Sequence, residues 1–291
     1  MRFLLIGGRG QLGRDLQALL PDDVVALDLP EFDVTSGDQV EAALQTLRPD
    51  WVINCAAQTN VDGCETAAQE AFAVNALGAL HVARSAAAVE AAVVFISTDY
   101  VFRGPHLLGY AESDRPAPAN VYGVTKLAGE QFTLAYNPRA LVVRTSGLYG
   151  HAGARGKGGN FVETMLRLGR EQRPIRVVSD QVLSPTSTVE CAAKVVELCA
   201  RNARGLVHVA AADACSWYEF ARTIFEESGL AVNLAPIPSS EYPTPARRPA
   251  MSALRSERLA GLGVASCRTW REMLTEYLET RPAARTTVHT V

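Results

Sequence analysis

The sequence lacks a hydrophobic run that could cross a membrane and lacks the excess of positive charge that marks nucleic-acid binders. Its first apolar run, residues 3–6, is followed by two glycines, whereas a membrane-spanning helix needs about 20 apolar residues. The 28 basic and 31 acidic residues give a formal net charge of -3, and nucleic-acid binding normally requires a basic surface. We therefore expect a cytoplasmic protein with neither a membrane nor a nucleic acid as its partner.

Closely spaced metal-binding residues are also missing. The six cysteines form no C-x-x-C pair, and the five histidines do not cluster with them. Such spacing is typical of structural zinc sites, and a chain of 291 residues needs no disulfide to stabilise its core. We expect reduced, mostly structural thiols and no metal site.

Short apolar runs alternate with helical segments through the first half of the sequence. These runs show little polar alternation, which is typical of strands covered on both faces. The predicted strands are residues 2–7, 23–28, 51–55, 92–97 and 141–145, and the predicted helices are 11–20, 37–47, 67–89 and 121–136. The alternation predicts an α/β fold with a Rossmann-type doubly wound parallel sheet. We expect residues 1–150 to form a dinucleotide-binding domain.

The pattern changes after residue 150, where the glycine-rich segment 151–159 predicts a loop. Beyond it we predict helices 161–171, 189–201, 217–227 and 268–278 and strands 175–178 and 206–210. Ser216 and Glu219 have the spacing of a capping box that opens the third of these helices. Five prolines in residues 236–249 predict an ordered loop instead of a helix or strand. We expect 151–280 to form mainly a smaller α/β substrate-binding domain, some elements of which return to the first sheet, and 281–291 to be a flexible tail.

A glycine-rich turn connects the first predicted strand to the first predicted helix. Gly7, Gly10 and Gly13 lie three residues apart, so that a pyrophosphate can approach bare backbone amides at a helix N-terminus. Asp28 follows 21 residues after Gly7, where the dinucleotide-binding fingerprint has an acid for the adenosine ribose. Asp28 would repel a 2′-phosphate and Arg9 would attract it, so both NADH and NADPH remain open.

Tyr122 and Lys126 lie four residues apart on one face of a predicted helix. A nearby ammonium stabilises tyrosinate, so we expect Lys126 to lower the pKa of Tyr122 toward that of a useful acid/base. This spacing arises by chance in many helices. Here, however, Thr98 also ends the fourth predicted strand, where ligand sites of α/β sheets form. The three residues together predict a catalytic site.

Several motifs carry a resemblance to a known family. They are G-x-x-G-x-x-G at 7–13, NCAA at 54–57, STDYVF at 97–102, NVYGVTKLAGE at 120–130, GNF at 159–161, SDQ at 179–181, SPT at 184–186 and YPTPARRP at 242–249. Together they resemble the extended short-chain dehydrogenase/reductases and, more narrowly, the dTDP-4-dehydrorhamnose reductase family. The resemblance extends to about residue 278.

The resemblance implies a role for each matching residue. Tyr122 would be the proton donor, Lys126 would hold the nicotinamide ribose, and Thr98 would hydrogen-bond the substrate carbonyl. The implied residues that bind NADPH or NADH are Gly7, Gly10, Gln11, Leu12, Gly13, Asp28, Asp33, Val34, Ala56, Ala57, Thr59, Tyr122 and Lys126. The implied substrate-binding residues are Thr98, Asp99, Tyr122, Asn160, Gln181 and Arg247.

The implied reaction is reduction of the C4 ketone of a nucleotide-linked 4-keto-6-deoxyhexose, as from dTDP-4-dehydro-L-rhamnose to dTDP-L-rhamnose. Dehydratases of the superfamily carry a second acid at the position of Tyr100, so the motif favours simple reduction. Gly147 stands where the family usually has tryptophan, which leaves the sugar and its stereochemistry open. The alternatives are reduction of another nucleotide 4-keto sugar and a non-catalytic NADP-binding regulatory subunit. The nucleobase and a homodimer also stay open.

Eight basic and two acidic residues in the segment 139–176 give it a local charge of +6. Such a segment favours a substrate with two phosphates, although part of it, with Arg167 and Arg170, also fits a solvated helix face. Trp217 and Trp270 lie in helical patterns, and we expect both in the core.

Overall fold

A six-stranded parallel sheet forms the centre of the molecule in the computed structural model, which describes residues 1–20, 23–104, 106, 108–152 and 159–281. The strand order is β2-β1-β3-β4-β5-β8. The bounds are β1 Phe3–Ile6, β2 Val24–Leu27, β3 Trp51–Asn54, β4 Ala92–Thr98, β5 Ala140–Thr145 and β8 Gly205–His208. The strand order reverses between β1 and β3, which is where sheets of this type bind their ligands. The predicted doubly wound parallel sheet is confirmed.

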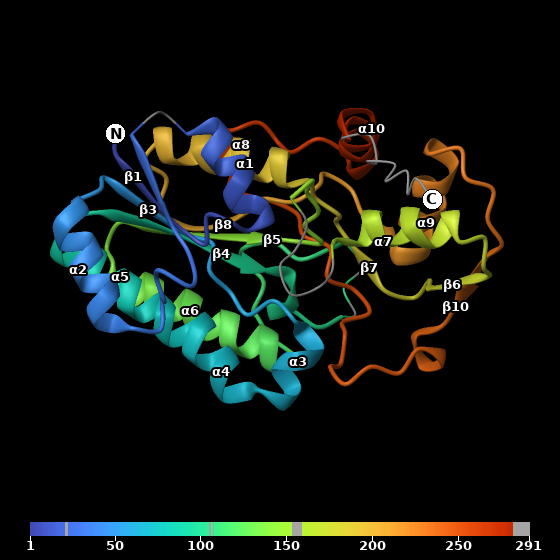
Figure 1. Cartoon of the computed structure of the whole chain (residues 1–291), viewed down its shortest axis with the longest axis horizontal. Coiled ribbons are helices and arrows are strands. Elements are labelled where there is room, and N and C mark those ends of the chain that lie inside the picture. The colour runs from blue at the N-terminus through green and yellow to red at the C-terminus, as the bar shows by residue number, and fades with distance from the viewer. Residues whose placement is uncertain (21–22, 105, 107, 153–158, 282–291) are drawn as a thin grey trace, which may run out of the picture.

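Helices cover both faces of this sheet (Figure 1). One face carries α1 (Gln11–Leu19) and α8 (Thr188–Ala200), and the other carries α2 (Gly37–Leu47), α5 (Gly78–Ala88) and α6 (Val121–Tyr136). All residues of β1, β3, β4 and β5 are buried. Their apolar runs therefore reflect packing on both sides, as the sequence indicated.

The helix predicted over 67–89 is interrupted. It consists of α4 (Ala68–Phe72), the π-helical turn η1 (Ala73–Leu77) and α5. A short helix that was not predicted, α3 (Val61–Thr66), precedes them. The π-helical turn carries Asn75, which is fully buried and donates to the Oγ1 of Thr125 on α6 at 3.0 Å. The irregular turn thus contacts α6 directly through Asn75, and π-turns are frequent at functional sites.

The later part of the chain forms a second group of elements beside the sheet (Figure 1). Its helices are α7 (Phe161–Arg170), α9 (Trp217–Glu227) and α10 (Trp270–Thr280), and its strands are β6 (Ile175–Val178), β7 (Val182–Leu183), β9 (Cys215–Ser216) and β10 (Leu234–Ile237). A buried cluster that includes Phe220, Ile224, Trp270 and Met273 holds these helices together. Trp270 is therefore a core residue, as predicted.

Two of the later elements lie with the first sheet. β8 pairs with β5, and α8 packs on α1 through residues that include Leu16, Cys191 and Val195. The division of the chain into two domains near residue 150 therefore stays a prediction. α8 and β8 follow residue 150 in the sequence but pack with the elements that precede it. The predicted tail, residues 281–291, lies outside the described residues apart from Arg281.

The proline-rich segment is more regular than predicted. Pro236 and Ile237 belong to β10, which pairs in parallel with β6, and Ser239–Glu241 forms the 3-10 turn η3. The prediction of a loop over 236–249 is wrong for these residues. A two-stranded ribbon exposes an edge on each strand, and an edge tolerates a proline that cannot donate a hydrogen bond. Only the distant partner β6 makes this segment a strand.

Capping residues fix two helix starts. Ser216 and Glu219 form the predicted capping box of α9, and Thr269 and Glu272 form a second one. The second box sets the start of α10 at Trp270, two residues later than predicted.

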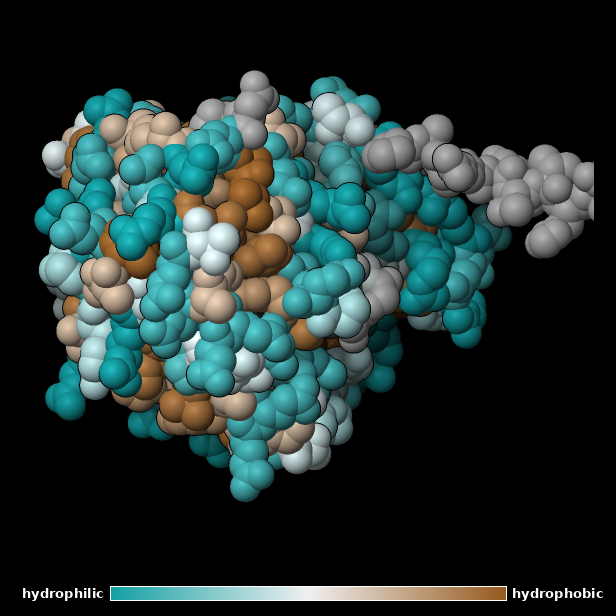
Figure 2. Space-filling view, turned by 60° about the vertical axis from the view of Figure 1, so that its left-hand side comes forward, coloured by the Kyte–Doolittle hydropathy of each residue, from teal (hydrophilic) through white to brown (hydrophobic). Residues whose placement is uncertain are grey.

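No helix of the described residues is long and apolar enough to span a membrane. The face in Figure 2 is mostly hydrophilic, with small hydrophobic patches between the polar side chains.

Candidate active site

The glycine-rich turn approaches the end of β3 too closely for any side chain. Gly7 has a φ of +80°, and a Cβ there would lie 2.8 Å from the backbone nitrogen of Ala56. A Cβ on Gly13 would lie 2.4 Å from the carbonyl oxygen of Gly7. Gly10 is the N-cap of α1 and offers no side-chain cap. The first amides of α1 are thus open to an anion, as in dinucleotide cradles.

This packing gives a prediction for Gly13. Gly13→Ala places a methyl group against the backbone of Gly7, so we expect the turn to open and NADPH to bind about a hundredfold more weakly. Gly261→Ala is the matched control, because a Cβ at Gly261, in the 3-10 turn η4 (Ala260–Leu262), meets nothing within 4 Å. Fluorescence titration with NADPH measures both variants. Equal dissociation constants for the two would contradict the assignment of the cradle.

Asp28 holds the glycine-rich turn from the end of β2. Its Oδ2 accepts from the backbone nitrogen of Arg9 at 2.7 Å, and its Oδ1 accepts from the backbone nitrogen of Leu29 at 2.8 Å. The Arg9 guanidinium donates to the carbonyl of Leu29 at 2.7 Å and pairs with Glu31 at 2.9 Å. Asp28 and Arg9 therefore lie together beside the cradle, where the sequence expected the adenosine.

The next cofactor candidates lie around the same sheet edge. Asp33 accepts from the backbone and hydroxyl of Thr35 at 2.9 and 2.8 Å. Val34 is 6% exposed, so its side chain belongs to the core and only its backbone can border a cofactor. Ala56, Ala57 and Thr59 are half-buried after β3. In Gln11, Nε2 donates to Leu148 at 3.1 Å, and Oε1 is buried with no partner among the described residues. Leu12 is buried against the sheet.

Tyr122 lies in the first turn of α6. Asn120 caps this helix by accepting from the backbone nitrogen of Gly123 at 2.8 Å. A Cβ on Gly123 would lie 2.2 Å from the carbonyl oxygen of Tyr100, so only glycine lets α6 start this close to the 3-10 turn η2 (Asp99–Val101). The rings of Tyr100 and Tyr122 meet edge to face at 5.8 Å. The glycine thus brings Tyr122 to the end of β4.

The expected lowering of the pKa of Tyr122 by Lys126 is wrong for this structure. Burial raises the pKa of Tyr122 well above its usual range, and a hydrogen bond with Thr98 opposes this rise only in part. Burial also lowers the pKa of Lys126 to about 8. The Lys126 Nζ donates to the carbonyl of Ile96 at 2.6 Å and lies 4.0 Å from the centre of the Phe95 ring. The ammonium is therefore engaged by β4.

Thr98 ends β4, and Asp99 begins η2. Thr98 donates to the Oδ1 of Asp99 at 3.0 Å and accepts from the backbone nitrogen of Tyr100 at 3.2 Å. Asp99 is 2% exposed, and its Oδ2 accepts from Ser146 at 2.9 Å and from Ser252 at 2.6 Å. This enclosed carboxylate cannot be a direct substrate contact, so that expectation for Asp99 is corrected.

A small cleft adjoins this group. It is lined by Tyr100, Gln181, Val182, Leu183, Trp217, Pro249 and Ser252. Gln181 lines this cleft, and its role as a substrate contact stays a prediction. Trp217 is half-buried and reaches the cleft as well as Phe161, whose ring centre is 4.5 Å away. The expectation of a purely internal Trp217 is incomplete.

Gly147 cannot carry the tryptophan of the family pattern in this backbone. Its φ is +52°, and a Cβ there would lie 2.7 Å from the Cδ1 of Leu183. A residue with a side chain would strain the backbone and clash with β7. The wall of the site near β5 is therefore built without an indole at this position.

Asn160 and Arg247 differ in how they lie. Asn160 caps α7 through the backbone nitrogen of Glu163 at 3.0 Å, and its amide donates to Gly150 at 2.8 Å and Tyr277 at 3.1 Å. These bonds occupy its side chain, so the expected substrate contact is corrected to a helix-capping role. Arg247 is exposed, and its carbonyl accepts from Asn120 at 2.9 Å. That bond places Arg247 next to the start of α6, where it can meet a substrate.

Arg248 fastens the same loop to α3. It donates two hydrogen bonds to the carboxylate of Asp62, at 3.0 and 2.8 Å. The backbone nitrogen of Ala246 also donates to Asp62 at 3.1 Å. Bidentate pairs of this kind fix geometry as well as charge. The proline-rich segment is thereby held against the edge of the sheet that carries Tyr122.

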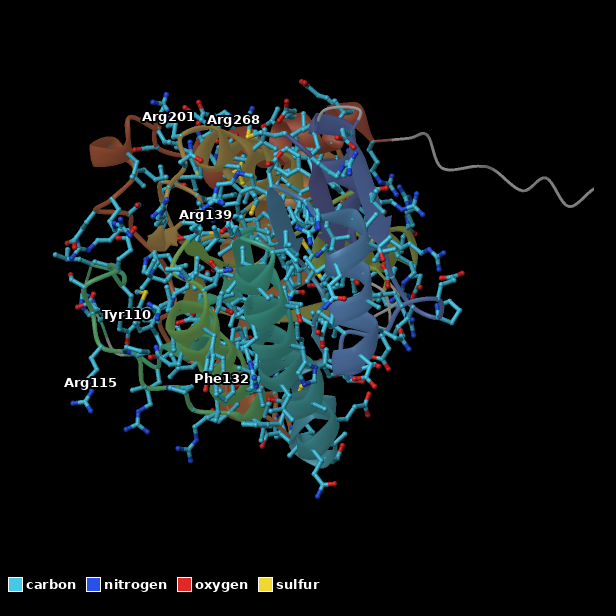
Figure 3. The ribbon with its side chains drawn as sticks, turned by 90° about the vertical axis from the view of Figure 1, so that its left-hand side faces the viewer. Tyr110, Arg115, Phe132, Arg139, Arg201 and Arg268 are labelled. Carbon is cyan, nitrogen blue, oxygen red and sulfur yellow. The ribbon has the colours of Figure 1, made fainter. Side chains whose placement is uncertain are left out.

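Most of the described basic residues between 139 and 176 have other partners. Arg139, labelled in Figure 3, donates to the carbonyl of Glu90. Arg144 is buried in an ion pair, and Arg167, Arg173 and Arg176 pair with acids. Residues 155 and 157 lie outside the described residues. The expected attraction of this segment for phosphates is therefore not supported by the residues that the structure describes.

Sequence reasoning missed the ion pair below the site. The guanidinium of Arg144 on β5 donates to Glu130 on α6 at 2.8 and 2.7 Å, and Ser97 donates to the same carboxylate at 2.5 Å. Glu130 follows Lys126 by one helical turn, and its charge raises the pKa of Lys126 against the effect of burial. Glu130 stands between Gly129 and Gln131, and these neighbours gave no sign that its side chain would face inward.

Comparison with known proteins shows the family to which a chain with this fold and these motifs belongs. A family model described as the RmlD substrate binding domain matches residues 1–282. The chain belongs to this family. A dTDP-4-dehydrorhamnose reductase of Escherichia coli is 38% identical to the RmlD-family chain over 275 residues, which cover 89% of this chain and 90% of that protein. The spore coat polysaccharide biosynthesis protein SpsK of Bacillus subtilis is 38% identical over 286 residues, 97% of this chain and 99% of that protein.

Solved structures similar to the RmlD-family chain include two dTDP-4-dehydrorhamnose reductases. The one from Clostridium acetobutylicum has a TM-score of 0.91 and 40% identity and covers 96% of this chain and 99% of its own. The one from Bacillus anthracis was solved in complex with NADP. It has a TM-score of 0.91 and 39% identity, and the match covers 96% of this chain and 98% of its own. A UDP-glucose 4-epimerase from Thermus thermophilus shares only the fold, with 21% identity and a TM-score of 0.80. The resemblance and fold class inferred from the sequence are confirmed.

Proposed function

We propose that this protein is an NADPH- or NADH-dependent reductase of the C4 ketone of a nucleotide-linked 4-keto-6-deoxyhexose, with dTDP-4-dehydro-L-rhamnose as substrate and dTDP-L-rhamnose as product. The observation that carries the proposal is the position of a phenol, Tyr122, in the first turn of α6 beside the end of β4, at the sheet edge that also holds the glycine-rich cradle. The relatives named as dTDP-4-dehydrorhamnose reductases support this choice of substrate.

The residues present fit a dinucleotide. Gly7 and Gly13 leave the volume that a Cβ would fill, and α1 begins there without a side-chain cap. We assign Asp28 to the adenosine ribose and Lys126 to the nicotinamide ribose. A dinucleotide bound there would supply a hydride to the ketone carbon. The similar reductase solved with NADP supports this cofactor.

Tyr122 acts on the ketone oxygen. As the hydride arrives, negative charge develops on this oxygen, and the phenol donates its proton there. An acid that serves in reduction must hold its proton until that moment. Burial helps, because it raises the pKa of Tyr122 and keeps the phenol protonated at neutral pH. The Lys126 charge then lies one helical turn away to stabilise the tyrosinate that remains.

The sugar nucleotide enters from the side of the proline-rich segment. Tyr100, Gln181 and Trp217 line the cleft next to the catalytic tyrosine. The cleft has room for about one water molecule, so we place the sugar at its mouth and not inside it. Arg247 is exposed beside the start of α6, and we assign it to the diphosphate, since guanidinium groups bind phosphate oxygens in pairs. A homodimer and a cytoplasmic location stay predictions.

The test is a panel of nucleotide-linked keto sugars. We expect the protein to oxidise NADPH or NADH when given dTDP-4-dehydro-L-rhamnose, which a stopped-flow absorbance trace measures and product analysis by mass spectrometry confirms. UDP- and GDP-linked 4-keto sugars report the tolerance for the base. Oxidation with only another sugar would favour the broader reductase. Binding of NADPH without oxidation of any sugar, together with a stable complex with another enzyme, would replace the proposal with the regulatory subunit.

A further inference from the structure

The ammonium group of Lys126 is buried, although the proposed reaction needs it as a cation. Lys126 is 2% exposed. In that reaction it stabilises the tyrosinate that Tyr122 leaves behind, which only a charged ammonium can do. Burial works against this role, because a low-dielectric surrounding disfavours the charged form of a lysine. The fold must therefore supply groups that keep the proton on Lys126 and hold its side chain in place.

Strand β4 supplies contacts for the ammonium but no charge. The Nζ of Lys126 donates to the carbonyl oxygen of Ile96 at 2.6 Å and lies 4.0 Å from the centre of the Phe95 ring. A carbonyl oxygen accepts a hydrogen bond, and the face of an aromatic ring attracts a cation. Both groups are neutral, so they orient the ammonium without compensating its charge.

Glu130 is the carboxylate that accompanies Lys126 on α6. Residues four apart on a helix lie on one face, with their Cβ atoms about 5–6 Å apart. Glu130 is 1% exposed, and it accepts from the hydroxyl of Ser97 at 2.5 Å. Lys126 and Glu130 thus contact the consecutive residues Ile96 and Ser97 of β4. The two side chains lie together between the helix and this strand.

Arg144 on β5 holds the carboxylate of Glu130 in place. Its guanidinium donates to Glu130 through Nε at 2.8 Å and through Nη2 at 2.7 Å, which is the bidentate geometry of strong arginine–carboxylate pairs. Arg144 is the partner of Ser97 in the register of β4 and β5. The two donors to Glu130 therefore stand side by side on neighbouring strands, and together they fix the carboxylate against the sheet.

The other titratable groups near Lys126 do not supply a negative charge at neutral pH. Burial raises the pKa of the Cys55 thiol, after β3, to about 12. Burial also raises the pKa of Tyr122 on the same helix, so the phenol is neutral before the reaction. His208, beside Arg144, is neutral because burial lowers its pKa to about 4. The turn η1 also packs on α6 and contains no titratable residue.

Charged residues of the helices that pack on α6 have other contacts. On α3, Asp62 pairs with Arg248, and Glu65 accepts from the backbone nitrogen of Val121 at the start of α6. On α5, Arg84 lies over an aromatic ring at the far end of α6. Among the residues that the structure describes, Glu130 is therefore the anion that acts on Lys126.

We propose that Glu130 is a positioning residue for Lys126: anchored by Arg144 and Ser97, it is the buried counter-charge that keeps the Lys126 ammonium charged and in contact with β4. The inference rests on the proposed reductase function, which assigns Lys126 to the tyrosinate. Burial lowers the pKa of Lys126 to about 8, and Glu130 opposes this fall. Without Glu130, Lys126 would lose its proton at lower pH, and the tyrosinate would lose its stabilising charge.

The decisive variant is Glu130→Gln, which keeps the size of the side chain and removes its charge. Activity needs the charged ammonium, so kcat falls as the pH rises through the pKa of Lys126, and the variant moves this alkaline limb to lower pH. The phenol does not cause the limb, because burial holds the pKa of Tyr122 well above its usual range. A move of about one pH unit predicts about a fivefold lower kcat at pH 8 and an almost unchanged kcat at pH 6.

A second readout needs no turnover. The chain has three lysines, Lys126, Lys157 and Lys194, so labelling with 13C-lysine gives few NMR signals. The signal that is absent from Lys126→Met belongs to Lys126. We expect this signal to titrate at lower pH in Glu130→Gln than in the unmodified protein. This shift, with no sugar reduced by either protein, would remove the reductase proposal and keep the counter-charge role of Glu130.

Glu190→Gln is the matched control. Glu190 is 7% exposed and pairs with Arg268 at 2.8 Å, but it lies on α8, which covers the other face of the sheet (Figure 1). We expect this variant to leave the Lys126 titration and the alkaline limb unchanged. An unmoved Lys126 titration in Glu130→Gln would overturn the positioning role. A kcat that falls equally at pH 6 and pH 8 would do the same, since a merely structural loss has that pattern.

The double variant Glu130→Gln with Arg144→Met covers the case in which Glu130→Gln does not fold. It leaves neither member of the buried ion pair without its partner, and circular dichroism checks its fold. The pKa of Lys126 responds to burial, to Glu130 and to Cys55, so we expect the Lys126 signal to move in the same direction as in Glu130→Gln. A signal that titrates as in the unmodified protein would overturn the proposal.

Discussion

Tyr122→Phe is expected to lower kcat at least about a hundredfold while NADPH binds as before. General acid catalysis contributes about two to four orders of magnitude, and the phenylalanine ring fills the same volume without a proton to donate. The edge-to-face contact with Tyr100, at 5.8 Å, needs only the ring, so the fold of η2 and α6 stays intact. The loss therefore falls on the chemical step.

The measurement is steady-state reduction of dTDP-4-dehydro-L-rhamnose, with NADPH affinity taken from fluorescence. Tyr136→Phe is the control on the same helix, since Tyr136 is 47% exposed at the other end of α6. Near-normal turnover in Tyr122→Phe would end the assignment of the proton donor. An equal loss in both variants would point to damage of the helix instead.

Arg144→Met is expected to destabilise the protein by about 3–5 kcal/mol, because it leaves the Glu130 carboxylate buried without its partner. The two side chains are 2% and 1% exposed, so water cannot replace the lost hydrogen bonds. His208 cannot supply the missing charge. Burial lowers its pKa to about 4, so its ring is neutral near pH 7, and it lies 3.5 Å from the Nη1 of Arg144.

Denaturant unfolding followed by circular dichroism gives this free energy. The double variant Arg144→Met with Glu130→Gln is expected to recover part of the loss, because it removes the uncompensated charge as well. Arg201→Met is the control, since its pair with Glu197 is exposed and should contribute no more than about 1 kcal/mol. A change below about 1 kcal/mol in Arg144→Met would show that the buried pair is not required for stability.

The local sequence was sufficient for the parts of the site that depend on backbone shape. Gly7 and Gly13 have to be glycines because the backbone of the turn packs too closely for a Cβ, at Gly7 against the residues after β3. The regular spacing of glycines in the sequence shows this requirement. The strands were found from their apolar runs, because burial on both faces removes polar residues from a strand. α6 was placed within its observed bounds because its cap, Asn120, and its helical pattern adjoin in the sequence.

Contacts between distant segments decided the rest. The Asp99 carboxylate accepts hydrogen bonds from Ser146 and Ser252, which lie 47 and 153 residues away in the sequence. No local sequence pattern distinguishes those serines from others. The strand β10 contains Pro236 and exists because β6 pairs with it.

The sequence by itself determined the strand-helix alternation, the glycine-rich cradle and the pairing of Tyr122 with Lys126 on one helical face, since each depends on spacing along the chain. Only the tertiary structure decided the direction in which the pKa of Tyr122 shifts, the burial of Asp99 and the hydrogen-bond partner of Lys126. The physical reason is that burial and hydrogen bonding are set by which segments pack together, and spacing along one segment does not contain that information.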